Sequence, residues 1–161
     1  MNTLYEKCDS LNSPIECFMD YGSRCSFPIK PHWHYFMEII YIFEGHAEVR
    51  SGSTVISAGR GDMALFHPKA VHSISSDSPD DLRYGVIKLD INCINMTADY
   101  APKFRSIFSF AEQRGMSIYF DNAQTEAIEA SRIFENCIKE MQVRRYGYND
   151  IIRSDISCLL V

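Results

Sequence analysis

The feature of this sequence that most constrains its fold is a succession of short β-strand patterns between Ile15 and Asp90. Each pattern is rich in β-branched or aromatic residues, and turn-forming groups such as Ser51-Gly52-Ser53 separate one pattern from the next. Strands that recur roughly every 8 to 12 residues with no helix between them predict an all-β sandwich or barrel. The expected strands are Ile15 to Tyr21, Tyr35 to Phe43, Ala47 to Arg50, Thr54 to Ser57, Met63 to Phe66, Ser73 to Ser75 and Leu82 to Leu89.

The chain changes to helical patterns beyond residue 95. Pro102 suits the first turn of a helix and Gly115 suits its end, and residues 116–120 predict one last strand. Asp121 and Gln124 then have the spacing of a capping box, which predicts that a further helix begins there.

Two amphipathic helices are expected at the carboxyl end. The first covers residues 123–146 and ends at Gly147, and the second begins at Asn149. The sequence stops at Val161 inside an apolar helical pattern, so we expect that more protein follows. The predicted organisation is an N-terminal arm over 1–14, a β-domain over 15–120 and a helical segment over 121–161.

Composition narrows the class of protein. A chain of 161 residues that is 46% hydrophobic forms one domain with a core of its own. Its formal net charge of -5 disfavours a surface that binds nucleic acid, because such a surface needs concentrated positive charge. The sequence shows no export signal and no apolar run of the roughly 20 residues that span a bilayer. We therefore expect a cytoplasmic protein that does not enter the membrane.

A cluster of metal-ligating residue types stands out in the second expected strand and its approach. If the segment is extended from His32 onward, the side chains of His32, His34 and Glu38 project from one face, because alternate residues of a strand share a face. Two imidazoles and a carboxylate can bind a divalent transition metal, and His72 is a natural fourth ligand if its strand lies alongside.

These residues resemble the motifs of the cupin superfamily of small jelly-roll barrels. His32, His34, Glu38 and Gly45 match the first motif, H-x-H-x3-E-x6-G, in full. Gly61 and His72 match the second motif, G-x5-P-x-G-x2-H-x3-N, in part. The positions of its proline, second glycine and asparagine are taken here by His67, Lys69 and Ser76.

A longer resemblance covers nearly the whole chain. The arm, the strand from His32 to Tyr41, the hairpin from Gly61 to His72, the strand from Leu82 to Leu89 and the closing helices are similar to the N-terminal, effector-sensing domain of AraC-family transcription regulators. The resemblance implies a cupin-type double-stranded β-helix followed by a pair of α-helices. It also implies a DNA-binding domain beyond residue 161, through which alone the protein would contact DNA.

Two functions from different classes follow. As a sensor, the domain would bind a small-molecule effector, with a carbohydrate as the family-level expectation, among His32, His34, Glu38, His72 and Tyr84, and would need no cofactor. As a cupin metalloenzyme, a dioxygenase or a sugar isomerase, it would use the three histidines and Glu38 to hold Zn, Ni, Fe or Mn. The degraded second motif and the helical tail favour the sensor over the enzyme.

Lys88, the N-terminal arm and the carboxyl-terminal helices each allow more than one interpretation. Lys88 shares strand parity with Tyr84 and could enter the barrel, but a solvated ammonium is the stronger expectation because burial of an unpaired charge is costly. The arm either frays or, as the resemblance implies, folds over the effector pocket or reaches toward the DNA-binding domain. The resemblance also implies a homodimer through the helices, for which we select Ile133, Met141 and Val143.

Overall fold

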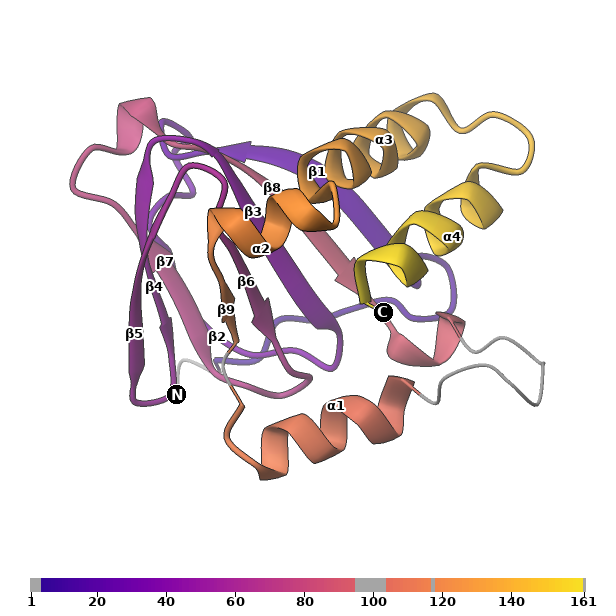
Figure 1. Ribbon diagram of the computed structural model, residues 1–161, viewed down its shortest axis with the longest axis horizontal. Coiled ribbons are helices and arrows are strands. Elements are labelled where there is room, and N and C mark those ends of the chain that lie inside the picture. Colours follow the sequence, from indigo (N-terminus) through magenta and orange to yellow (C-terminus); the bar gives the residue numbers. More distant parts are fainter. Residues whose placement is uncertain (1–3, 95–103, 117, 161) are drawn as a thin grey trace.

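Two antiparallel sheets pack face to face in the computed structural model, which describes residues 4–94, 104–116 and 118–160 (Figure 1). The five-stranded sheet has the order β1-β8-β3-β6-β9 and the four-stranded sheet the order β2-β7-β4-β5. The strands are β1 (Ile15–Tyr21), β2 (Ile29–His32), β3 (Met37–Glu44), β4 (His46–Ser51), β5 (Thr54–Gly59), β6 (Met63–Phe66), β7 (His72–Ser75), β8 (Arg83–Leu89) and β9 (Tyr119–Phe120).

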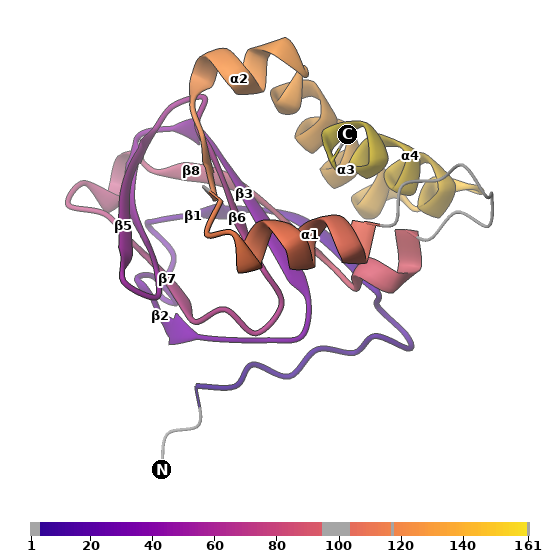
Figure 2. The same ribbon diagram turned by 60° about the horizontal axis from the view of Figure 1, so that its bottom comes forward.

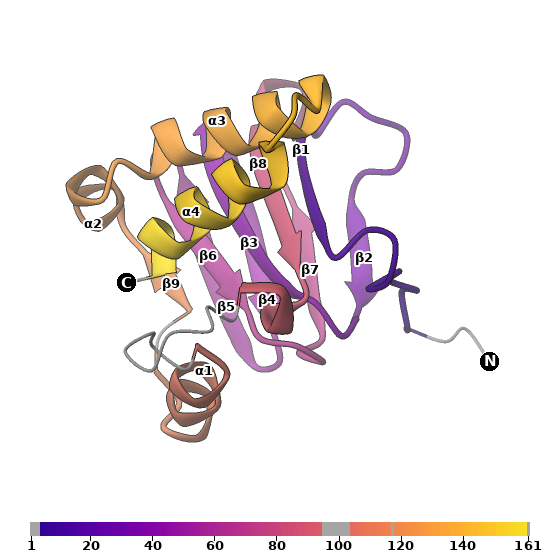
Figure 3. The ribbon, with the colours of Figure 1, turned by 90° about the vertical axis from the view of Figure 1, so that its right-hand side faces the viewer.

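The helices lie outside the two sheets. Figure 3 shows α3 and α4 crossing the outer face of the five-stranded sheet, and α1 lying below that sheet near β9. The helices are α1 (Phe104–Gln113), α2 (Asn122–Ala127), α3 (Ala130–Val143) and α4 (Tyr148–Leu160), with short 3-10 turns η1 (Pro79–Asp81) and η2 (Ile91–Ile94). Among the described residues, no helix has the length and apolarity needed to cross a membrane.

Strand β3 is buried on both faces, which explains its nearly continuous apolar sequence. Its odd-numbered residues, such as Ile39 and Tyr41, belong to the core cluster that includes α3 and α4. Its even-numbered residues Ile40 and Ile42 belong to a second cluster between the two sheets. The fold therefore has two apolar layers, and Glu38 lies in the row that faces the interior of the barrel.

Helix α3 approaches the sheet closely at a glycine. A Cβ atom on Gly85 of β8 would lie 2.8 Å from Cδ1 of Phe134 and 2.9 Å from Cε2 of Phe43. No side chain fits between these rings, so glycine is required here for helix and strand to meet. The ring of Phe134 lies 5.5 Å from that of Tyr41, centroid to centroid.

The predicted fold class is confirmed. The two antiparallel sheets and the closing helices α3 and α4 are present, and the expected strands match β1 and β3 to β8 closely. The capping box is also present, because the side chain of Asp121 accepts from the backbone N–H of Gln124 while the side chain of Gln124 accepts from the backbone N–H of Asp121. Of the residues predicted to bracket the first helix, Gly115 follows α1 with a positive φ, and Pro102 lies outside the described residues.

The single long helix predicted over 123–146 is wrong. The chain breaks at Glu129, which has a φ of 54°, and forms α2 and α3 in different directions (Figure 2). Helix α2 is tied to the end of the barrel, where Oγ1 of Thr125 donates to the carbonyl oxygen of Gly61 at 2.6 Å, whereas α3 lies across the sheet. One straight helix cannot make both contacts. Helix α3 also ends at Val143 rather than at Gly147.

Phe134→Ala should destabilise the domain by about 3 to 5 kcal/mol, because it removes a fully buried ring and leaves a cavity over Gly85. Urea denaturation followed by circular dichroism measures the change in free energy of unfolding. Phe110→Ala is the matched control, since Phe110 is 54% exposed and its loss should cost less than about 0.5 kcal/mol. Equal effects of the two substitutions would contradict this account of how α3 is attached.

Candidate functional site

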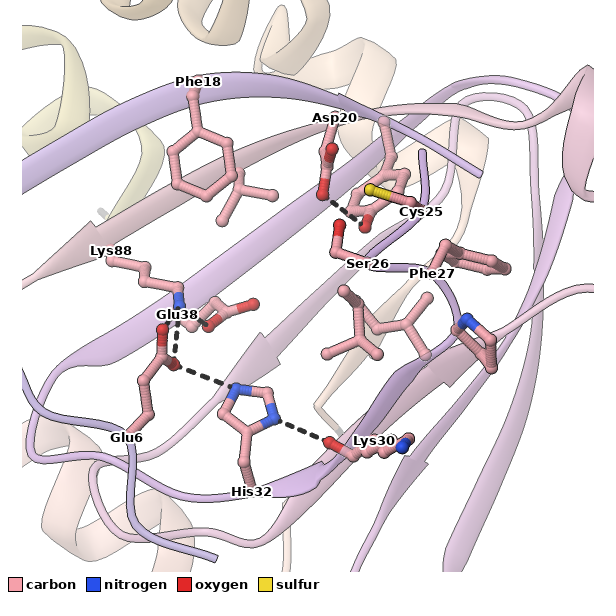
Figure 4. Close-up of a pocket in the computed structure, with 15 residues that line it drawn as sticks. Glu6, Phe18, Asp20, Cys25, Ser26, Phe27, Lys30, His32, Glu38 and Lys88 are labelled. Carbon is pink, nitrogen blue, oxygen red and sulfur yellow. Dashed lines mark hydrogen bonds and ion pairs between the residues drawn. The ribbon is translucent and has the colours of Figure 1, made fainter. Parts of the chain in front are cut away.

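A cavity of about 790 Å³ lies between the two sheets (Figure 4). Its walls are apolar side chains from both sheets and from the segment that precedes β2, namely Phe18, Phe27, Pro28, Ile29, Ile74 and Val86. Polar groups gather at two ends. Lys88, Glu38, Glu6 and His32 are at one end, and Asp20, Cys25 and Ser26 are at the other. The barrel is therefore partly hollow.

The four predicted ligand residues meet at the first end of this cavity. One ligand atom from each of His32, His34, Glu38 and His72 lies within 4.8 Å of the others. Nε2 of His34 lies 2.8 Å from Oε2 of Glu38, and Nε2 of His72 lies 3.4 Å from the same oxygen. His34, Glu38 and His72 are buried, while His32 is partly exposed.

The reason that the sequence suggested for this convergence is wrong. His32, His34 and Glu38 do not share one strand, since His32 ends β2 of one sheet and Glu38 belongs to β3 of the other. His34 lies in the irregular segment between these strands. The chain crosses from sheet to sheet within six residues, and pairing of His32 with His72 brings the last imidazole alongside. Two facing sheets, rather than strand parity, assemble the group.

All three imidazoles are oriented by the backbone. In each ring, Nδ1 donates to a backbone carbonyl oxygen. The acceptor is the carbonyl of Lys30 for His32 at 3.0 Å, of Phe36 for His34 at 2.9 Å and of Ala70 for His72 at 2.9 Å. A carbonyl can only accept, so we infer that Nδ1 carries a proton in each ring. An ionised carboxylate also only accepts. A proton or a cation must therefore lie between each Nε2 and its carboxylate oxygen.

This donor set fits a divalent metal. Three imidazole nitrogens and one carboxylate oxygen, each ring fixed by its second nitrogen, are the ligands and the supporting hydrogen bonds of many transition-metal sites. His32, His34, Glu38 and His72 could therefore hold a metal ion. Lys69, which stands where the second cupin motif has glycine, adopts the left-handed backbone that suits glycine, with a φ of 70°.

Lys88 is buried at this end of the cavity, which corrects the expectation of a solvated side chain. Its Nζ donates to Oε2 of Glu6 at 2.9 Å and to Oε1 of Glu6 at 3.1 Å, and lies 3.4 Å from Oε2 of Glu38. Burial alone would lower the pKa of Lys88, but the charge of Glu38 and the hydrogen bond to Glu6 raise it above its ordinary value. The ammonium is buried because two carboxylates neutralise it.

Glu6 is a site residue that the sequence did not identify. It belongs to the N-terminal arm, and its Oε2 also lies 3.2 Å from Nε2 of His32. The hydrogen bond to His32 acts against burial and, with Lys88, lowers the pKa of Glu6 to about 2. Of the three placements considered for the arm, the one over the pocket agrees with the position of Glu6. No periodic pattern in so short a segment could have indicated this contact.

The far end of the cavity holds a second buried carboxylate, Asp20. The hydroxyl of Tyr84 donates to Oδ2 of Asp20 at 3.0 Å, and Arg24 pairs with Oδ1 at 3.2 Å. Burial and the neighbouring Asp20 raise the pKa of Tyr84, so its hydroxyl stays protonated. Tyr84, a predicted ligand-binding residue, therefore lines the cavity as expected from its parity, at the end opposite the histidines.

The three residues selected for dimerisation lie in different environments. Ile133 is 1% exposed and packs in the core beneath α3, so it is not part of a free surface. Met141 is partly buried and packs against the same core. Val143 is 55% exposed at the end of α3. The helical periodicity located a second apolar stripe but did not show which of its residues the sheet would cover.

Comparison with known families identifies the class of protein. Residues 17–153 match the model of the AraC-like ligand binding domain, which spans most of the chain. The chain therefore belongs to the AraC-like ligand-binding domain family, in agreement with its resemblance to the sensing domains of AraC-family regulators. No curated protein matches the sequence significantly.

One solved structure supports the fold, and two others show a weaker similarity. The AraC-family regulator ToxT of Vibrio cholerae, in a structure described as bound to unsaturated fatty acid, superposes with a TM-score of 0.56 at 9% identity, and the match covers 90% of this chain and 52% of ToxT. An RmlC-like cupin of Shewanella frigidimarina has a TM-score of 0.40 at 17% identity over 47% of this chain and 65% of its own. The DMSP lyase DddQ of Ruegeria pomeroyi has a TM-score of 0.39 at 20% identity over 48% of this chain and 39% of its own. This chain thus spans about half to two thirds of the first two proteins.

Divalent cobalt added to chelator-treated protein should produce the visible absorption of a cobalt–imidazole complex, because the three Nε2 atoms converge. His72→Gln should weaken cobalt binding by about tenfold or more, in line with the loss of a well-oriented ligand. His46→Gln is the control, since His46 is exposed and bonded to Ser57, and it should bind as the wild type does. Equal binding by all three proteins would place the metal elsewhere.

Proposed function

We propose that this domain is the effector-sensing part of a DNA-binding transcriptional regulator and that its effector binds in the cavity between the sheets. The observation that carries the proposal is a large cavity with polar groups at both ends, inside a domain of the AraC-like ligand-binding family. Such a cavity can desolvate the apolar body of a small molecule while its polar ends pair with the ligand's own polar groups.

The lining of the cavity favours one kind of effector over another. Its apolar walls would contact hydrocarbon or aromatic surface, which supports a ligand with an apolar body more than the carbohydrate that the family resemblance suggests. The description of ToxT as bound to unsaturated fatty acid supports an amphipathic ligand in a domain of this architecture.

The effector would act through differential binding. It can change regulation only by the difference between its affinities for two arrangements of the protein, which typically amounts to about 1 to 3 kcal/mol. In this proposal the DNA contacts belong to a further domain, consistent with the acidic charge of this chain. The regulator would work in the cytoplasm, where it reaches both its effector and DNA.

The second candidate function is a cupin metalloenzyme, favoured by the convergence of three imidazoles and Glu38. A bound metal would supply Lewis acidity or redox chemistry. Protein purified without an affinity metal column separates the candidates, by metal analysis combined with oxygen-consumption and isomerase assays. Stoichiometric metal with turnover would establish the enzyme, whereas metal without turnover would leave the sensor with a structural ion.

Ligands that stabilise the domain should protect Cys25, which is exposed and lines the cavity. A metabolite panel screened by thermal shift identifies such ligands, because binding to the folded state raises its stability. At a ligand concentration ten times the Kd, alkylation of Cys25 by iodoacetamide should slow about tenfold. Mass spectrometry measures the rate, with the exposed Cys158 of α4 as the internal control. Ligands that stabilise the domain without protecting Cys25 would exclude this cavity as the effector site.

We also propose that the sensor forms a homodimer through the end of α3. The support is the exposure of Val143 beside Tyr146, whose side chain is fully exposed. Two exposed apolar side chains at a helical corner are suited to the centre of a two-fold contact. Met141 could contribute, while Ile133 cannot, since the core already covers it.

Val143→Glu should shift the dimer toward monomer, raising the dimerisation Kd about tenfold or more, because a carboxylate at a two-fold contact faces its own copy. Analytical ultracentrifugation over a concentration series measures the change. Val55→Glu on β5 is the matched control, since Val55 is 51% exposed on another surface, and it should not alter the equilibrium. A monomeric wild type, or equal effects of both substitutions, would refute the interface.

A further inference from the structure

The carboxylate of Glu6 lies between the cationic Lys88 and the imidazole of His32 at one end of the cavity. It accepts two hydrogen bonds from Lys88 and lies 3.2 Å from Nε2 of His32. Among the described residues of the arm, it alone lines the cavity. Figure 4 shows it entering from the arm between Lys88 and His32. In effect, the protein places an acid of its own in the pocket.

Apart from Glu6, the segment of residues 4 to 8 is held by contacts with residues 33 to 36. Residues 4 to 6 pair with Trp33 through two backbone hydrogen bonds, from Trp33 N–H to the carbonyl of Leu4 at 2.8 Å and from Glu6 N–H to the carbonyl of Trp33 at 2.9 Å. The ring of Tyr5 packs on Trp33 with centroids 4.8 Å apart. Leu4 and Tyr5 are exposed. A segment with so little buried surface opens at a small cost in free energy.

Charge balance determines what can replace Glu6. Lys88 lies between Glu6 and Glu38, and Glu38 is too deeply buried to leave. If Glu6 withdraws, the second acceptor of Lys88 and the partner of His32 are both lost. An incoming carboxylate restores both interactions and keeps the net charge of this end unchanged. A neutral ligand would leave the ammonium with Glu38 alone.

We propose that the effector is an organic acid whose carboxylate replaces that of Glu6 on Lys88 and His32 and so releases the N-terminal arm. The proposal rests on the proposed function, because it assumes that the effector occupies this cavity. It adds the chemical class of the effector, an acid with an apolar body that follows the walls at Phe18 and Val86. It also specifies the structural consequence of binding, in which the carboxylate of the effector takes the place of the carboxylate of Glu6.

The protein carries a reporter of arm release. Trp33 is the only tryptophan in the sequence, and the arm covers it through Tyr5. Octanoate titrated into chelator-treated protein should change the fluorescence of Trp33 and expose the bond after Lys7 to trypsin. Octanamide, which has the same chain without the charge, should do neither. Glu6→Gln should show the changed fluorescence without any ligand.

Affinity for octanoate, measured by calorimetry, should depend on Glu6, because its carboxylate competes with octanoate for Lys88 and His32. Glu6→Gln should bind octanoate about tenfold more tightly than the wild type, since no internal carboxylate competes. Lys88→Met should bind it at least tenfold more weakly. Glu48→Gln is the matched control, because Glu48 is similarly exposed and paired with Arg50, and its affinity should equal that of the wild type.

Octanoate affinity that is unchanged by Glu6→Gln, octanamide binding equal to that of octanoate, or no octanoate binding even by Glu6→Gln would overturn the inference. The metabolite panel keeps this failure distinct from failure of the proposed function. If a neutral metabolite protects Cys25 equally in the wild type and in Glu6→Gln, the cavity is an effector site and the role of Glu6 is wrong. If no metabolite or acid protects Cys25 in either protein, both proposals are wrong.

Discussion

Burial of strand β3 on both faces is the constraint on which the remaining architecture depends. One face must be covered by helices and the other by a second sheet, since apolar side chains project from both. On the helix side, Phe134 packs over Gly85. The sheet side is left partly hollow and ends at Glu38, a carboxylate that is only 3% exposed. The cavity and its charged end therefore follow from how β3 is enclosed.

Enclosure of Glu38 determines the chemistry around it. Burial raises the pKa of this carboxyl, but the hydrogen bonds of His34 and His72 and the charge of Lys88 outweigh burial and hold the pKa well below its usual range. An ionised group in this position needs donors from every neighbouring element. The histidines, the ammonium and the carboxylate of the arm form one network, in which the arrival of a metal or an acid must displace a resident partner.

The arm connects this network to the surface. Glu6 is close enough to Lys88 and His32 to belong to the site, yet its backbone is tied to the domain near Trp33 by exposed contacts. An event inside the cavity can therefore alter a segment outside it without deforming either sheet, and this is how a rigid barrel can transmit a signal. Glu6 also lies against the imidazoles of the site, with its Oε2 3.2 Å from Nε2 of His32.

Local patterns in the sequence determined every strand of the two large sheets except β2, the capping box at Asp121 and the identity of the four residues that converge at one end of the cavity, because each depends on neighbours within a few positions. They did not determine the break at Glu129, the burial of Lys88 or the entry of Glu6. A helix bends where two distant surfaces require it, and a lysine is buried only if carboxylates from other elements meet it. Even His32, His34 and Glu38 came together for a reason outside the pattern. The sequence determines their spacing, whereas the packing of two sheets against each other determines that their side chains converge. Which charged groups become buried is likewise decided only by the tertiary structure.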